Sequence, residues 1–417
     1  MRRFILFLLF WGTSIAYSQD VRLLQCWEKA EQNYPRAKDR EDYERIANLR
    51  VKNYRAVYLP KVDVNAQATY QSDVTQVDAS RIPIPNFNIG SPAKDQYKLT
   101  ADISQLIWDG GAAKASEKLE MASLYADKQQ VEVDLYNLKG RVAQLFYSVA
   151  LKREQIKLQR ALKSDLDEKM KRTISGVRNG ATLKANELLL RSEILKLTQE
   201  INGAENEING LIDALSILVG EPISRIAEFV WVDVAMTEIS RPEYMLFQKQ
   251  KDRIEILNES YTSKRMPKIA AFGQVGYGKP GLNMFSTSFD PFYIVGLKAS
   301  WNIFDWNSTK RDRQSLRLLQ NMVDTRQAMF EISQKMELAQ ESSTVAKFES
   351  LLKTDEELIT ARQEVAKAYS VMYDNGAIDA ADYVGRQTEL KQAELNREMH
   401  RVMLSFSKVN INIIKGK

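Results

Sequence analysis

The sequence contains two copies of one pattern, and this duplication restricts the possible folds more than any other feature. Three stretches occur twice in the same order: LPKVDVNAQATY (59–70) and MPKIAAFGQVGY (266–277), IWDGGAAKASEKLEMA (107–122) and IFDWNSTKRDRQSLRL (303–318), and, more faintly, VRNGATLKANELLLR (177–191) and YDNGAIDAADYVGRQ (373–387). The offset from Asp109 to Asp305 equals that from Gly180 to Gly376, 196 residues. Each copy is therefore predicted to run strand, loop, strand, long helix, Asn-Gly turn and returning helix.

Both copies contain strands that alternate between apolar and polar residues. In 61–70 one face would carry Val62, Val64, Ala66, Ala68 and Tyr70, and the stretches 97–104 and 293–303 alternate in the same way. A strand of about ten residues with one apolar face suits the wall of a membrane β-barrel. It also suits half of a hairpin packed on a soluble core, so the strands alone leave both possibilities open.

A long helix is expected after each second strand. The ranges 112–175 and 309–373 contain no proline and carry narrow apolar stripes, in the first helix including Leu158, Leu162, Leu166, Met170 and Ile174. About 64 helical residues would span about 95 Å, and a narrow stripe amid dense charge favours coiled-coil packing.

Shorter helices are expected to complete the height of the long ones. The returning helices cover about 183–218 and 379–414, and further helices cover about 21–58 and 243–264. We expect one returning helix and one further helix, stacked end to end, to match each long helix.

Composition and the N-terminal residues indicate an exported protein. MRRFILFLLFWGTSIAYSQ has a basic start, an apolar run and a small-x-small site, which predicts a signal peptide cleaved before Gln19. The net charge of +5 falls to +3 without Arg2 and Arg3, which is too mild and too scattered to indicate nucleic-acid binding. No other stretch reaches 18 apolar residues, so no transmembrane helix is expected.

The sequence offers little for catalysis, metal binding or cofactor binding. Cys26 and His400 are the only cysteine and histidine, which excludes a His/Cys metal cluster. GQVGYGKPG (273–281) resembles a phosphate-binding loop, but Pro280 occupies the Ser/Thr position. We therefore expect no enzyme activity and no cofactor. LLQC could be read as a lipoprotein site, but Gln25 replaces the small residue expected before the cysteine, so an inert thiol is the better interpretation.

Four amphipathic strands are too few to close a membrane barrel, for which eight is the usual minimum. Open strand edges in lipid leave amide groups without partners, at several kcal/mol each. Several copies of the chain must therefore share one barrel of eight, twelve or sixteen strands, which the helices would continue as a tube.

The signal peptide, the two LPK/MPK strands, the IWDGG/IFDWN junctions and the two Asn-Gly turns together resemble the TolC family of outer-membrane efflux proteins, over about residues 20–412. The fold class this implies is mainly α with membrane β. A duplicated strand-strand-helix-helix repeat would give four strands per chain to a shared trimeric β-barrel, continued by a long periplasmic α-helical coiled-coil barrel.

The resemblance also implies a location and partners. The protein would be a homotrimer in contact with outer-membrane lipid of a Gram-negative bacterium, extending into the periplasm. It would dock to a periplasmic adaptor (membrane fusion) protein and an inner-membrane transporter. Its function would be the exit duct of a tripartite efflux or type I secretion system.

The resemblance implies a gate near the helix turns. Asp382 matches the gate aspartate of the family and Tyr373 its network tyrosine, whereas Gly385 and Asn186 replace further acids. A single acidic ring argues against strong cation block at this entrance. Asp382 could instead be a solvated carboxylate at a helix start, and Tyr373 could serve helix packing.

Other candidate residues have structural roles. Asn179, Gly180, Asn375 and Gly376 would form the tight helix turns. Membrane-interface aromatics are expected at the strand ends, at Trp108, Trp301 and Trp306.

The expected organisation is a signal peptide (1–18), an N-terminal helical segment (19–58), a first membrane β-hairpin (59–108), a first periplasmic helical hairpin (109–218), an equatorial segment (219–242), a short helix (243–265), a second membrane β-hairpin (266–306) and a second periplasmic helical hairpin (307–414). The alternative from another class is a soluble periplasmic coiled-coil adaptor or scaffold protein, whose hairpins would pack on a partner.

Overall fold

The computed structural model describes residues 20–75, 91–231 and 241–416. The expected signal peptide, most of the first strand-to-strand loop and the centre of the equatorial segment lie outside these ranges. The chain divides into two compact units, which are described separately. Unit 1 comprises Met1–Ala37, Val131–Pro242 and Met329–Lys417, and unit 2 comprises Lys38–Gln130 and Glu243–Ala328.

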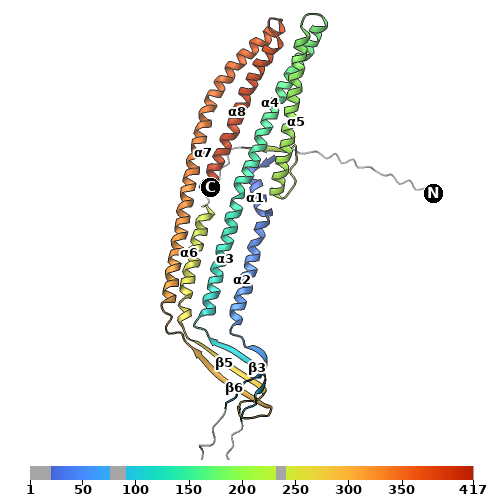
Figure 1. The fold of residues 1–417 in the computed structure, drawn as a ribbon. Coiled ribbons are helices and arrows are strands. Elements are labelled where there is room, and N and C mark those ends of the chain that lie inside the picture. Colours follow the sequence, from blue (N-terminus) through green and yellow to red (C-terminus); the bar gives the residue numbers. More distant parts are fainter. Residues whose placement is uncertain (1–19, 76–90, 232–240, 417) are drawn as a thin grey trace, which may run out of the picture. The chain divides into compact units, whose positions relative to one another are not determined.

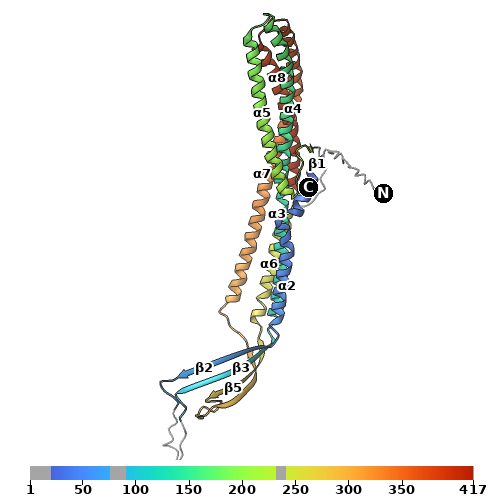
Figure 2. The same ribbon diagram turned by 90° about the vertical axis from the view of Figure 1, so that its right-hand side faces the viewer.

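Unit 2 contains one antiparallel sheet of four strands. Its order is β2 (Lys61–Tyr70), β3 (Asp95–Trp108), β5 (Lys268–Lys279) and β6 (Asp290–Ser300), so the two hairpins of the duplication pair with each other through β3 and β5 (Figure 2). One register row aligns Val64, Ala101, Val275 and Tyr293. The alternation expected from the sequence is therefore confirmed, because residues of one face meet across all four strands.

The apolar face of this sheet is exposed within the chain. Val64 is 72% exposed, Val295 73% and Leu297 73%. The opposite face is more polar, and there the Asp102 carboxylate accepts hydrogen bonds from Asn65 at 2.7 Å and from Thr100 at 2.9 Å. The sheet thus keeps its hydrogen-bonding side chains on one face and leaves large aliphatic side chains on the other.

A bulge near the end of β3 changes the direction of one aromatic side chain. The β3–β5 register shifts between Leu106 and Trp108, which places Trp108 opposite Ile269. Because a bulge adds one residue to a strand, Trp108 shares the apolar face with Ile103 rather than the polar one.

Four helices of unit 2 form a layer in the order α2 (Asp39–Ala56), α3 (Ala112–Tyr136), α6 (Pro242–Ser260) and α7 (Ser308–Asp374), as Figure 1 shows. Ion pairs and ring contacts join neighbouring helices in this layer: Arg50 to Glu120 at 3.0 Å, Lys249 over the Tyr125 ring at 5.9 Å, and Lys251 to Asp324 at 2.6 Å. Helices α3 and α7 continue into unit 1.

Unit 1 is built around α4 (Leu138–Arg178). Helices α1 (Leu23–Asn33), α5 (Lys184–Val219) and α8 (Ala380–Lys415) pack on it, and α7 lies beside α8 (Figure 1). The core includes Phe146, whose ring lies 5.1 Å from that of Phe229 in β4 (Glu228–Val230). β4 pairs in parallel with β1 (Asp20–Arg22).

Cys26 lies in the same core and is 3% exposed. Burial raises the pKa of its thiol to about 11. The thiol is therefore protonated at neutral pH and is a poor nucleophile.

Two expected continuous helices are interrupted. The range 21–58 is divided into α1 and α2 by a 3₁₀ turn at Pro35–Lys38, because proline lacks the amide that a helix interior requires. The range 112–175 is divided at Asn137, which keeps helical dihedral angles of −64° and −18°, so this interruption is local. No helix among the described residues is both long enough and apolar enough to cross a bilayer.

The duplicated aspartates explain why the strand-to-helix junctions repeat. Asp109 accepts from the amides of Gly111 at 2.8 Å and Ala113 at 2.6 Å, and Asp305 accepts from Asn307 and Thr309, both at 3.0 Å. Each carboxylate thus supplies the acceptor that the free amides of a starting helix need.

The two sites differ in burial. Asp109 is 3% exposed and also accepts from the Tyr58 hydroxyl at 2.7 Å. Burial by itself would raise the pKa of Asp109, but the hydrogen bonds from Tyr58 and the helix amides hold that pKa below its usual value. Its contribution to stability is therefore present above the unfolded-state pKa and is lost as the pH falls through the lower folded-state pKa.

Replacing the buried cap, Asp109, should cost more than replacing the half-buried one, Asp305. We expect Asp305→Ala to lower the free energy of unfolding of unit 2 by about 1 kcal/mol, the usual value for a cap. Asp109→Ala should cost about 2 kcal/mol, because the Tyr58 hydroxyl also loses its acceptor. Urea unfolding of the detergent-solubilised protein measures both, with the exposed Glu364→Ala as control. Equal losses for all three variants would contradict the capping role.

Candidate functional site

The two Asn-Gly turns of unit 1 have the same backbone geometry. Asn179 and Asn375 end α4 and α7, and the glycines that follow, Gly180 and Gly376, have φ angles of +69° and +70°. In both turns the amide after the glycine donates to the carbonyl five residues earlier, at 2.8 Å and 2.9 Å. This is the Schellman arrangement, whose positive φ favours glycine, so these residues build the turns.

A buried lysine joins the two helical hairpins close to the turns. Lys169 of α4 is 7% exposed, and its ammonium group donates to both carboxylate oxygens of Asp374 in α7, at 2.9 and 2.8 Å. It also donates to the Ser370 hydroxyl at 3.0 Å. All three donor positions of the ammonium group are thus used in contacts from the first hairpin to the second.

Tyr373 belongs to a second link between the same hairpins. Its hydroxyl lies 2.7 Å from the Thr173 hydroxyl, and its ring stacks on that of Tyr383 with centroids 5.0 Å apart. Tyr383 is fully buried and donates to Asp165 at 2.6 Å. Burial, followed by the hydrogen bond to Asp165, raises the pKa of Tyr383, so its hydroxyl stays protonated and continues to donate.

Asn186 provides a further link. Its side-chain oxygen accepts from the backbone amide of Ala380, at 3.2 Å, at the first residue of α8. From the sequence, Asn186 was described only as a replacement for an acid. The structure shows that the side chain of Asn186 in α5 accepts a hydrogen bond from one of the backbone N–H groups that α8 leaves without a partner at its start.

Asp382 is exposed on the first turn of α8, and the structure does not place it in this network of buried contacts. Its backbone amide donates to Asp379, the N-cap of α8, at 2.9 Å. Asp382 and Tyr373, which the sequence paired as gate candidates, therefore have different environments: Tyr373 is half-buried in the network, whereas the Asp382 carboxylate faces outward.

Sequence reasoning missed Lys169, Asp374 and Asp165. The signal that could have found Lys169 is its register: Leu162, Leu166, Lys169 and Thr173 follow coiled-coil spacing, and all four are buried. The expected stripe used steps of four residues and continued to Met170 and Ile174, which the structure leaves half-buried. Met170 packs against the same cluster as Leu162 and Leu166, so the stripe passes beside Lys169 and does not include it.

Aromatic side chains mark the apolar face of the sheet at its helix-proximal end. Trp108 is 42% exposed, Trp301 is 60% exposed and donates to the Arg265 carbonyl at 2.9 Å, and Trp306 is 76% exposed. The ring of Trp306 meets that of Phe304 with centroids 4.7 Å apart.

A second aromatic group, which the sequence reading missed, lies towards the opposite strand ends. Phe289 stacks on Tyr97 and Tyr277, at centroid distances of 6.0 and 5.6 Å. From Tyr97 to Trp108 the strand rises about 35 Å, which at the usual tilt of about 45° gives a height of about 25 Å. This is the height of the apolar band of outer-membrane barrels.

Residues 28–221 match the family model described as outer membrane efflux protein. This match, together with the fold, confirms the resemblance to outer-membrane efflux proteins stated from the sequence and the location in the outer membrane.

Solved structures give the same fold at low sequence identity. CusC aligns with a TM-score of 0.70 and 12% identity, covering 95% of this chain and 92% of CusC. The outer membrane channel CmeC of Campylobacter jejuni aligns with a TM-score of 0.66 and 13% identity, covering 94% and 85%. The outer membrane protein VceC of Vibrio cholerae aligns with a TM-score of 0.65 and 14% identity, covering 94% and 96%. No curated protein sequence matches the chain.

Removing the buried ammonium group should loosen the turns without unfolding unit 1. In Lys169→Met the carboxylate of Asp374, which is 37% exposed, can rehydrate, so we expect a loss of about 1–2 kcal/mol in local opening free energy. Amide hydrogen exchange in residues 162–186 and 370–384 should then be about five- to thirtyfold faster. Arg172→Ala is the control, because Arg172 also lies near Asp374, at 3.7 Å, but is 62% exposed. Equal exchange in both variants would contradict the role of Lys169.

Proposed function

We propose that the protein is the outer-membrane exit duct of a tripartite export system and passively conducts solutes delivered by an inner-membrane transporter and a periplasmic adaptor. The observation that carries this proposal is the exposed apolar face of the sheet, bounded by aromatic side chains towards both strand ends. The alternative, a soluble adaptor or scaffold, would leave this face in water unless a partner covered it.

The outer edges of the sheet support assembly from several copies. β2 pairs only with β3, and β6 pairs only with β5, so among the described strands each has one edge without a partner strand. In lipid these free amide and carbonyl groups would cost several kcal/mol each. Pairing β6 of one copy with β2 of the next removes both edges, and three copies give the twelve strands expected for the family.

The outermost helices of unit 2 support the same head-to-tail arrangement. α2 exposes Ile46 and Leu49, by 42% and 61%, and α7 exposes Leu318 and Met322, by 63% and 59%. These pairs are three and four residues apart, the spacing of a coiled-coil seam. Because the two surfaces are different and lie on opposite edges of the layer, joining them head to tail generates a ring when the rotation between copies closes, as a shared barrel requires.

Unit 1 repeats this feature. On α5, Leu188 and Leu195 are 55% and 57% exposed, and on α7, Leu358 and Val365 are 46% and 38% exposed. Each pair is one heptad apart. We infer that α5 of one copy packs on α7 of the next, so that the helices form a tube.

The links between the turns would hold the resting state of this tube. Lys169–Asp374, Thr173–Tyr373 and Tyr383–Asp165 fix the second hairpin against the first. A transporter and adaptor that favour an opened entrance would have to supply the free energy that separates these groups. Asp382, exposed beside the turn, would contribute one carboxylate per copy to the entrance.

A disruption of the gene tests the proposed export function and distinguishes efflux of solutes from secretion of proteins. Raised accumulation of dyes and drugs supports solute efflux, and a loss of secreted proteins supports type I secretion. If neither changes, the proposed duct is contradicted. A detergent-free monomer in the periplasmic fraction would instead favour the adaptor interpretation.

Charged substitutions in the exposed seam should prevent assembly. We expect Leu318→Asp combined with Met322→Asp to convert the trimer into monomers, because carboxylates would be buried between copies. Native mass spectrometry in detergent measures this. Ala328→Asp, exposed on α7 outside the seam, is the control and should remain trimeric. Trimers in both variants would show that Leu318 and Met322 do not lie at the interface between copies.

Neutralising Asp382 should change ion selectivity. A ring of carboxylates attracts cations, so Asp382→Asn is expected to lower the cation preference of single channels in planar bilayers. The control is Glu364→Gln, which replaces an exposed carboxylate on α7, whereas Asp382 lies on α8. Unchanged selectivity in Asp382→Asn would show that this residue lies away from the conduction path.

A further inference from the structure

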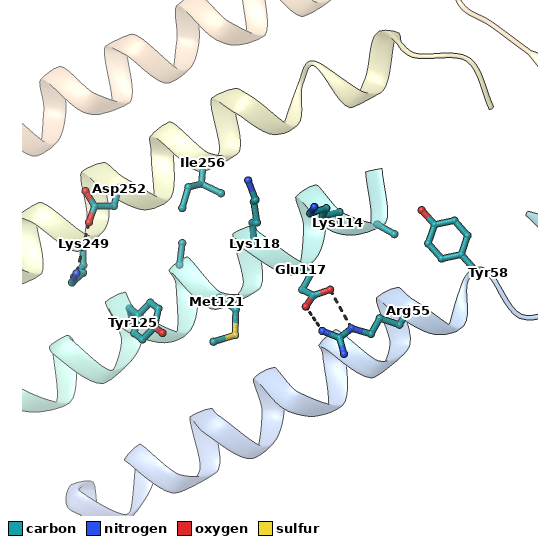
Figure 3. Close-up of a pocket in the computed structure, with 12 residues that line it drawn as sticks. Arg55, Tyr58, Lys114, Glu117, Lys118, Met121, Tyr125, Lys249, Asp252 and Ile256 are labelled. Carbon is teal, nitrogen blue, oxygen red and sulfur yellow. Dashed lines mark hydrogen bonds and ion pairs between the residues drawn. The ribbon is translucent and has the colours of Figure 1, made fainter. Parts of the chain in front are cut away.

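A cavity of about 750 Å³ lies over α3 in unit 2, between α2 and α6 (Figure 3). This volume is typical of sites that hold a small molecule. The cavity contains neither the links near the turns nor any residue of the sheet. Conduction through a shared lumen therefore does not by itself explain why it is present.

The floor of the cavity is apolar and elongated. Met121 and Tyr125 of α3 and Ile256 of α6 contribute large side chains, and Figure 3 shows Ile256 pointing towards α3. The lining follows α3 from Ala113 to Tyr125, about 18 Å, and its part beyond the lysines, from Lys118 to Tyr125, covers about 10 Å. A narrow apolar surface of this length fits one extended alkyl chain better than a compact ring system.

The rim of the cavity has an excess of positive charge. Its charged residues are the cations Arg55, Lys114, Lys118 and Lys249 and the carboxylates Glu117 and Asp252. Glu117 is occupied by Arg55, whose Nε donates to it at 3.2 Å and whose Nη2 donates to the other oxygen, and Asp252 lies 3.8 Å from Lys249. Two lysine charges therefore remain in excess.

These two lysines lie one helical turn apart. Lys114 and Lys118 are both exposed and occupy positions i and i+4 of α3, where like charges repel. Within the described ranges, Lys118 makes no ion pair or hydrogen bond, and both lysines also line a smaller neighbouring cavity of about 210 Å³. An anionic group between the two ammonium groups would remove this repulsion.

We propose that unit 2 binds a single-chain anionic amphiphile of the fatty-acid class. Its carboxylate lies between Lys114 and Lys118, and its alkyl chain follows α3 over Met121 and Tyr125 against Ile256. The charged end of the site falls in the first two turns of α3, which begins four residues after β3 ends. An amphiphile leaving the membrane surface would meet these lysines first.

Photo-crosslinking locates such a ligand directly. The full chain in amphipol is incubated with a decanoate analogue that carries a diazirine near its chain end, irradiated, and analysed by peptide mass spectrometry. We expect saturable insertion into peptides that contain Met121, Tyr125 or Ile256, displaced by unlabelled decanoate. The corresponding fatty alcohol, which lacks the charge, should label these peptides at least tenfold less.

Variants test the charged end. Lys114→Glu combined with Lys118→Glu should reduce labelling of the cavity at least tenfold, and Lys118→Gln should reduce it by a smaller factor. Lys52→Glu, exposed on α2 outside the cavity, should label as the wild type does. Insertion mainly into the apolar face of the sheet, equal labelling by acid and alcohol, or no effect of the Lys118 variants would each overturn the proposal.

Discussion

The unpaired edges of a four-stranded sheet are the constraint on which the rest of the structure depends. The sheet exposes aliphatic side chains on one face, yet among the strands that the structure describes its outer ones, β2 and β6, each have a free row of backbone donors and acceptors. Lipid stabilises the exposed apolar face, but it offers no hydrogen-bond partners to the free backbone groups at the two edges. The proposed barrel, to which several copies contribute, satisfies both, and the exposed seams on the outer helices fit the same ring of copies.

The duplication gives each pair of strands its own helical hairpin, built in the same way in both copies. In each copy an aspartate begins a helix directly after the membrane strand, and a positive-φ glycine reverses the chain at the far end. Between these fixed points the two hairpins are held by apolar packing and, near the turns, by polar groups at positions where a coiled coil places its core. Buried polar contacts are costly to form and depend strictly on geometry, so they suit the proposed entrance, which would hold one arrangement at rest and release it to another.

The sequence predicted the four strands, the long helices, both turns and the family, because alternation, proline-free stripes and Asn-Gly pairs are local signals. It did not predict the interruptions at Pro35 and Asn137 as such, nor the network around Lys169. That lysine resembles any other charge on a solvated helix until its partners, some 200 residues away, are known. The Trp108 bulge was also beyond reach, since a register shift depends on the partner strand rather than on the residues themselves.

The mass of the membrane-inserted assembly tests the central claim most directly. Native mass spectrometry of the mature protein released from outer-membrane nanodiscs should give a single species containing three chains, with little free monomer. A monomer that is stable in buffer without detergent or lipid would contradict the account, because its sheet edges and apolar face would then be satisfied within one chain.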